Sequence, residues 1–199
     1  MLSQKYTTKN LVASSLITGA NLFLFLFFSL VTLLAGRHQT SWNVACSLCL
    51  SSGALYFLLK VITLSLANTR AYRVLDTITR CFHYLFLMCL LYPLAFGITF
   101  YPRGWIAFGL ITAWGFLMLI YTAILYLRYW RWTYAVSLVT WIVCLILIFT
   151  FIPVDLGLIT AFILGCLAYY YDKTDPKFLV ISCLAETLML CFFTFGLLF

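Results

Sequence analysis

Four ionisable residues fall within or beside segments that are otherwise apolar: Lys60, Arg80, His83 and Glu186. A charged side chain at the centre of a membrane-spanning helix costs about 2.5–3.5 kcal/mol on insertion scales. Charges kept at that cost face a partner, a cavity or a ligand. These four residues therefore form a candidate polar pocket, and its fixed cations would suit an anionic lipid head group.

A structural explanation is available for the same residues. Lys60 and Arg80 lie close enough to the ends of their segments for their long side chains to reach the interface, and His83 is then a neutral packing residue. Glu186 is too short for this, and it lies about 12 Å into its segment. At matching depth, we predict that Glu186 faces the interior and contacts Lys60, Arg80 or His83.

Other arrangements of reactive residues are weaker. Cys46 and Cys49 form a C-x-x-C pair, a spacing used by redox and metal sites, but two small apolar residues on one helix face explain it as well. The only histidines are His38 and His83, so neither a set of three zinc ligands nor a nucleophile with a histidine base is visible. The sequence predicts no metal, no cofactor and no catalytic residue, which favours a protein that is not an enzyme.

The elements that must position these residues are membrane-spanning helices. The chain has 199 residues, of which 65% are hydrophobic and only 9% charged, whereas a soluble domain carries about 25% charged residues. One small core cannot bury so many apolar residues, so the surrounding solvent is lipid. The net charge of +7 then marks loops rather than a nucleic-acid partner. We predict an all-α integral membrane protein.

Seven apolar segments have the length of a membrane span, and together they form a single transmembrane domain. Because the connectors are short, sequential spans should be antiparallel neighbours. The predicted spans are 11–34, 44–66, 75–96, 105–127, 132–152, 156–171 and 178–199.

The distribution of Lys and Arg predicts the orientation of the bundle. Arg37 and Arg103 lie in connectors on one side. Because basic residues are enriched in cytoplasmic loops, we predict a cytoplasmic amino terminus and an external carboxyl terminus. The basic residues on the other side are Lys5, Lys9, Arg70, Arg73, Arg128, Arg131, Lys173 and Lys177.

Several segments carry a family resemblance in their order and spacing. The stretch NTRAYRVLDTITRCFHYLFLMCLLYP (68–93) is similar to the second-to-third helix region of the hemolysin III family, relatives of the progestin and adipoQ receptors. NLVASSLITGA (10–20), GWIAFGLITAW (104–114), SLVTW (137–141) and GCLAYY (165–170) resemble parts of its first, fourth, fifth and sixth helices. The resemblance covers nearly the whole chain and implies a seven-helix bundle.

The resemblance also implies a site between spans two, three and seven, where relatives bind zinc. This chain departs from the family at that site. Ser14 stands at the position of the first-helix His, Lys60 at a Ser, Leu64 at the span-two His and Thr79 at the span-three Asp. The last span contains no His. Fixed cations would then stand where the family has the metal.

The function that the resemblance implies is a non-enzymatic role in membrane lipid or energetic homeostasis, in a bacterial inner membrane. Its partners would be membrane lipids and, as an open alternative, further copies of the chain. A zinc-dependent lipid-amide hydrolase is an alternative that the missing ligands disfavour. A small cytolytic pore or transporter is another. It would need a continuous polar stripe, whereas the polar residues cluster at one end and the outer half is nearly all Leu, Phe, Ile and Cys.

Overall fold

The computed structural model describes residues 8–35, 40–67, 69–97, 103–125 and 179–198, together with residues 160, 163, 164 and 167. All regular secondary structure in these residues is helical, which confirms the all-α prediction. The long helices begin and end within a few residues of predicted spans. They are α1 (Thr8–Ala35), α2 (Thr40–Ser65), α3 (Tyr72–Gly97), α4 (Arg103–Leu125) and α7 (Leu179–Leu198).

Helices α1 to α4 are each long and apolar enough to cross a membrane, and α7 contains a shorter apolar segment, Leu179–Phe192. This agrees with an integral membrane protein. The predicted spans 132–152 and 156–171 lie outside the described residues, apart from the isolated positions within 160–167.

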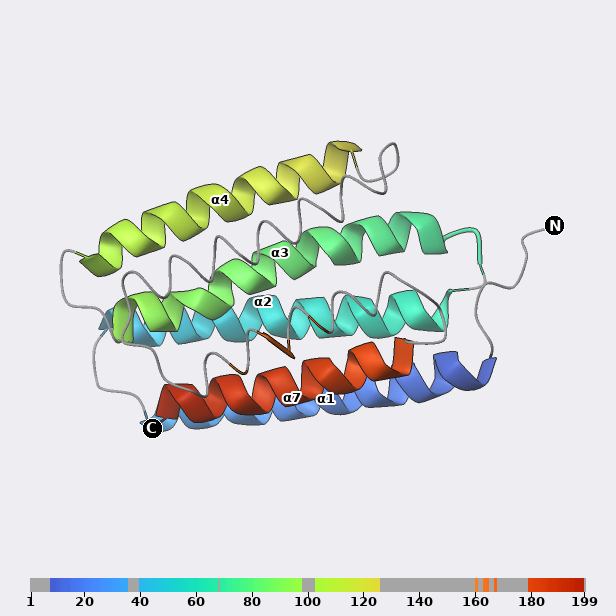
Figure 1. Cartoon of the computed structure of the whole chain (residues 1–199), viewed down its shortest axis with the longest axis horizontal. Helices are drawn as coiled ribbons and strands as arrows, with labels where there is room; N and C mark the ends of the chain where they lie inside the picture. Colours follow the sequence, from blue (N-terminus) through green and yellow to red (C-terminus); the bar gives the residue numbers. More distant parts are fainter. Residues whose placement is uncertain are drawn as a thin grey trace.

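The helices form an elongated bundle in which neighbours in sequence run in opposite directions (Figure 1). Helix α1 packs on α2, α2 on α3, α3 on α4, and α7 returns to pack on α1. Helices α1, α3 and α7 run one way, and α2 and α4 run the other (Figure 1). We call the end at which α2 finishes and α3 begins the basic end, because Arg70 and Arg73 lie there.

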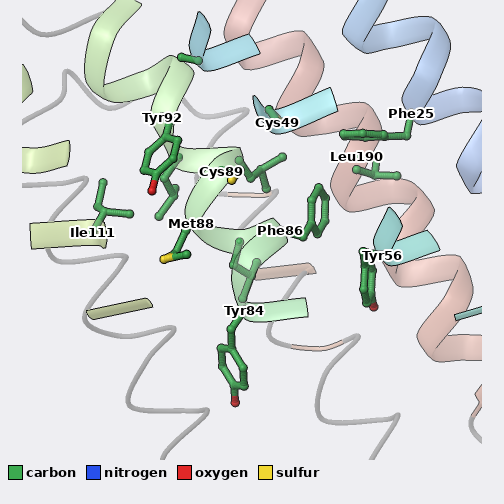
Figure 2. Close-up of a cluster of buried hydrophobic side chains, with 14 of the residues drawn as sticks. Phe25, Cys49, Tyr56, Tyr84, Phe86, Met88, Cys89, Tyr92, Ile111 and Leu190 are labelled. Atoms are coloured by element: carbon green, nitrogen blue, oxygen red, sulfur yellow. The ribbon is translucent and has the colours of Figure 1, made fainter. Parts of the chain in front are cut away.

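Aromatic rings fill the middle of the bundle (Figure 2). Phe25 of α1 lies 5.7 Å from Phe57 of α2 and 5.4 Å from Phe86 of α3, measured between ring centroids. Phe86 also stacks on Tyr56 at 5.3 Å. All four side chains are buried. We call these four residues the aromatic cluster, and it joins three helices by van der Waals packing, the main attraction between helices in lipid.

Two glycines allow close packing between helices, one at the aromatic cluster and one between α3 and α4. A Cβ atom at Gly53 would overlap the rings of Phe25 and Phe86, and one at Gly115 would overlap the side chain of Met88. Gly53 therefore sets the distance between α2 and the rings of α1 and α3, and Gly115 does the same for α4 on α3.

Candidate functional site

Lys60 and Glu186 form a buried ion pair between α2 and α7. Lys60 Nζ lies 2.6 Å from Glu186 Oε2, and the two side chains are 11% and 6% exposed. Counted from the basic end, Lys60 lies about 8 Å into α2 and Glu186 about 11 Å into α7. The two charges are therefore at similar depth, and this contact is one of those expected from the sequence.

Tyr56 binds the other oxygen of the same carboxylate. Its hydroxyl donates a hydrogen bond to Glu186 Oε1 at 2.7 Å. Tyr56 lies one helical turn before Lys60, whose Nζ lies 5.7 Å from the centroid of the Tyr56 ring. Helix α2 thus holds both oxygens of Glu186, one through a charge and one through a hydroxyl. Sequence reasoning missed Tyr56, although its i, i−4 spacing from Lys60 places both on one face.

His83 of α3 lies beside this pair. Its ring centroid is 5.2 Å from that of Tyr56 and 5.9 Å from that of Tyr84. His83 is partly buried. The structure therefore brings three of the four predicted pocket residues, Lys60, His83 and Glu186, around Tyr56.

Arg80 forms an ion pair within its own helix. Its Nε lies 3.1 Å from Asp76 Oδ2, and the two side chains are 14% and 16% exposed. The spacing of four residues, with the acid first, is a stabilising arrangement on a helix. Lys60 and Arg80 are thus each matched by a carboxylate, so these two cations supply no excess positive charge for an anionic head group.

Ser14, Leu64 and Thr79, the other positions compared with the family pattern, lie in the same half of the bundle as Lys60. Thr79 and Thr63 share a hydrogen bond of 2.7 Å between α3 and α2. Leu64 packs in a small cluster with Leu11 and Leu179, which belong to α1 and α7. Ser14 is fully buried on α1, and its backbone carbonyl accepts a hydrogen bond from the hydroxyl of Thr18.

A polar seam, which we define as Thr18, Asn21, Cys183 and Thr187, joins α1 to α7. The Thr187 hydroxyl donates to Asn21 Oδ1 at 2.6 Å, and Asn21 Nδ2 donates to the carbonyl of Cys183 at 3.3 Å. Thr18 Oγ1 lies 3.5 Å from Cys183 Sγ. Sequence reasoning missed this seam, but the spacing of Ser14, Thr18 and Asn21 places them on one helical face. On α7, Glu186 lies between Cys183 and Thr187 in the sequence.

The half of the bundle away from the basic end is less uniformly apolar than we expected. Ser29, Thr32 and Ser52 are buried there. The Thr32 hydroxyl donates to carbonyls of its own helix, and Ser52 does so to Cys49. The hydroxyls of Thr32 and Ser52 are thus satisfied within their own helices, and Phe25 lies between Asn21 and Ser29 in the sequence of α1. Across the described helices, the polar residues therefore form two groups separated by the aromatic cluster rather than one stripe.

Within the residues that the structure describes, no three His, Cys, Asp or Glu side chains come together closely enough to hold a metal ion. Cys46 and Cys49 are both buried on α2, and Cys49 belongs to the main apolar core.

Comparison of the chain with protein-family models, with curated proteins and with solved structures gave no match.

Proposed function

We propose that the chain is a non-enzymatic, seven-span membrane protein of the hemolysin III type, with a role in membrane lipid or energetic homeostasis. In this proposal the Lys60–Glu186 ion pair takes the place of the zinc site. The observation that carries it is the buried contact of 2.6 Å between these two side chains on α2 and α7.

The chemistry of the site supports a cross-link rather than a reaction centre. In the family that the chain resembles, zinc joins the second and last spans. Here Lys60 and Glu186 join the corresponding helices, and Tyr56 satisfies the remaining carboxylate oxygen. Removing one partner of a buried pair costs about 3–5 kcal/mol, because the other charge is left buried without its partner. The pair therefore favours the arrangement in which these faces of α2 and α7 meet, without a metal.

The ion pairs also bear on lipid binding. An anionic head group would have to displace Glu186 from Lys60, or Asp76 from Arg80. We therefore keep membrane lipids as the class of partner without assigning their head groups to this site.

The direction of the helices supports the seven-span count. Helix α4 ends and α7 begins at the basic end (Figure 1). Two further spans between these ends, the predicted 132–152 and 156–171, are compatible with both ends lying on one side of the membrane. Arg70 and Arg73 at the basic end favour a cytoplasmic location for that end, in a cell membrane such as the bacterial inner membrane.

The aromatic cluster makes a pore the weaker proposal. Phe57 and Phe86 are 0% and 1% exposed, and with Phe25 they fill the space between α1, α2 and α3. An ion crossing between these helices would have to pass three packed rings.

Metal analysis tests the proposal against the hydrolase. The protein is purified from membranes without added metal, its zinc content is measured, and its melting temperature is recorded with and without a chelator. We expect substoichiometric zinc, an unchanged melting temperature and no release of fatty acid from a long-chain ceramide. Stoichiometric zinc, with a chelator-dependent loss of stability that zinc restores, would overturn the proposal in favour of the hydrolase.

The proposed role in membrane lipid or energetic homeostasis needs a separate measurement. Cells expressing the wild-type chain are compared with cells expressing a Lys60→Met/Glu186→Leu double variant at equal protein level. We expect the phospholipid composition or the membrane potential to change only with the wild-type chain. Identical membranes in the two strains would contradict a role in homeostasis that depends on this site.

A further inference from the structure

A hollow lies between α2, α3 and α4 at the end of the bundle opposite the basic end. Its volume is about 260 Å³. The walls include Ala45 and Leu48 of α2, Tyr92 and Phe96 of α3, and Trp105 and Phe108 of α4. It lies far from the Lys60–Glu186 pair, since the first turns of α2 contribute to it and Lys60 is near the last turn.

The walls of the hollow are packed aromatic rings. The Phe108 centroid lies 4.7 Å from Tyr92 and 5.2 Å from Phe96, and Phe96 lies 5.1 Å from Trp105. The Tyr92 hydroxyl forms a hydrogen bond of 3.0 Å with Thr112 Oγ1, which joins α3 to α4. The walls are otherwise apolar, apart from Thr40 and Ser41 where α2 begins, and apolar cavities stay dry.

The lips of the hollow open toward lipid. Val44, Leu48 and Trp105 are 54%, 44% and 55% exposed, and the solvent around membrane-spanning helices is hydrocarbon. From Thr40 to Leu48 the hollow follows α2 for about 12 Å. Its inner part, from Val44 to Leu48, lies within the predicted span 44–66 and extends about 6 Å into the hydrocarbon of one leaflet, which is about 15 Å deep.

The volume also matches a chain of methylene groups. A cavity of about 150 Å³ holds benzene, so this hollow has room for roughly ten carbon atoms on the same scale. We propose that it binds one acyl chain of a membrane glycerolipid from the adjacent leaflet. The length of about 12 Å along α2, the mainly apolar walls and the opening toward hydrocarbon all fit this occupant. The inference requires only that α2, α3 and α4 lie in a membrane, and it is independent of the proposed function.

Photolabelling tests the proposal directly. The full-length protein is reconstituted in nanodiscs of phosphatidylcholine that contain a small fraction of a phosphatidylcholine with a diazirine at the middle of one acyl chain. After irradiation, the labelled residues are identified by mass spectrometry. Leu30 and Leu34 of α1 serve as internal controls, because they are exposed apolar residues toward the same end of the bundle.

A matched pair of variants separates a bound chain from ordinary surrounding lipid. Leu48→Trp places a large ring at the lip of the hollow. Leu55→Trp makes the same change two turns along the same face of α2, where Leu55 is 47% exposed and outside the hollow. Melting temperatures check that both variants are folded. Filling the lip leaves the core contacts of α2 in place, because Leu48 is already 44% exposed.

We expect Phe96, Trp105 and Phe108 to be labelled several times more strongly than Leu30 and Leu34. Leu48→Trp should remove that excess, and Leu55→Trp should retain it. Labelling no stronger than at the α1 controls would overturn the proposal, as would equal loss in both variants. A sterol photoprobe that labels the hollow and is not displaced by phosphatidylcholine would also overturn the assignment to an acyl chain.

Discussion

The ammonium group of Lys60 lies 2.6 Å from the carboxylate of Glu186, in the half of the bundle nearer the basic end. The two residues are 126 positions apart in the sequence, yet they lie at similar depth on α2 and α7. Tyr56 binds the second carboxylate oxygen. Glu186 therefore contacts both the Lys60 ammonium group and the hydroxyl of Tyr56, a member of the aromatic cluster.

Replacement of Glu186 should separate the effect of charge from that of hydrogen bonding. Glu186→Leu leaves the Lys60 ammonium buried without its partner, and we expect a loss of about 3–5 kcal/mol in the free energy of unfolding. Glu186→Gln keeps an acceptor for Tyr56 and should lose less. Unfolding of the purified protein in detergent measures both. Ile181→Leu on the exposed face of α7 is the control and should change little. A Glu186→Leu protein as stable as wild type would show that the pair does not hold the helices together.

Removal of the Tyr56 hydroxyl should cost more than removal of the Tyr92 hydroxyl. Both tyrosines are buried, but Tyr56 donates to a carboxylate and Tyr92 is bonded to the hydroxyl of Thr112. A hydrogen bond to a charged group contributes about 1.5–3 kcal/mol, and one between neutral groups about 0.5–1.5 kcal/mol. We therefore expect Tyr56→Phe to destabilise more than Tyr92→Phe in the same unfolding assay. Equal losses would indicate that the hydrogen bond from Tyr56 to Glu186 contributes no more than a bond between neutral groups.

The glycines offer a test of the aromatic cluster. Gly53→Ala would force a methyl group into Phe25 and Phe86, and we expect a loss of about 1–3 kcal/mol through overpacking. A methyl group at Gly109 would meet no neighbour within 4 Å among the described residues. Gly109→Ala should thus be neutral or stabilising by up to about 1 kcal/mol through helix propensity. If Gly53→Ala were as harmless as Gly109→Ala in thermal unfolding, the close packing of α1, α2 and α3 would be contradicted.

The orientation of the bundle can be tested by labelling single cysteines in intact cells. Thr40 and Thr69 are both exposed, at opposite ends of α2. With the native cysteines replaced, a membrane-impermeant maleimide should react with Thr40→Cys from outside and with Thr69→Cys only after the cells are opened. Thr174→Cys should behave like Thr69→Cys if seven spans are present. Reaction of Thr174→Cys from outside would contradict the seven-span topology.

The helices were largely predictable because lipid imposes a simple rule. A span needs about 20 apolar residues, so α1 to α4 and α7 begin and end close to the predicted limits. The contact between Lys60 and Glu186 followed from depth, since each residue advances a helix by about 1.5 Å and a buried carboxylate requires a partner. Depth did not decide which of three cations that partner would be.

The remaining contacts depend on how each helix is rotated, which hydrophobicity does not specify when a helix is apolar on every side. Glu186 meets Tyr56 and Lys60 because one face of α2 turns toward α7, and Asn21 meets Thr187 because α1 lies beside α7. Unlike Gly53 and Gly115, Gly19 and Gly109 have open space beside them within the described part of the chain. The spacing of Asp76 and Arg80 was readable in the sequence, because a pair four residues apart shares one face of a helix.

A double-mutant cycle on Lys60 and Glu186 tests the central claim most directly. The free energy of unfolding is measured for wild type, Lys60→Met, Glu186→Leu and the double variant. Each single change should be strongly destabilising, because it leaves one buried charge without its partner. The double variant should recover most of the loss, since apolar side chains of similar volume replace a buried pair at little or no cost. The account predicts a coupling energy of about 3 kcal/mol or more. Losses that simply add, with no coupling between the two positions, would contradict it.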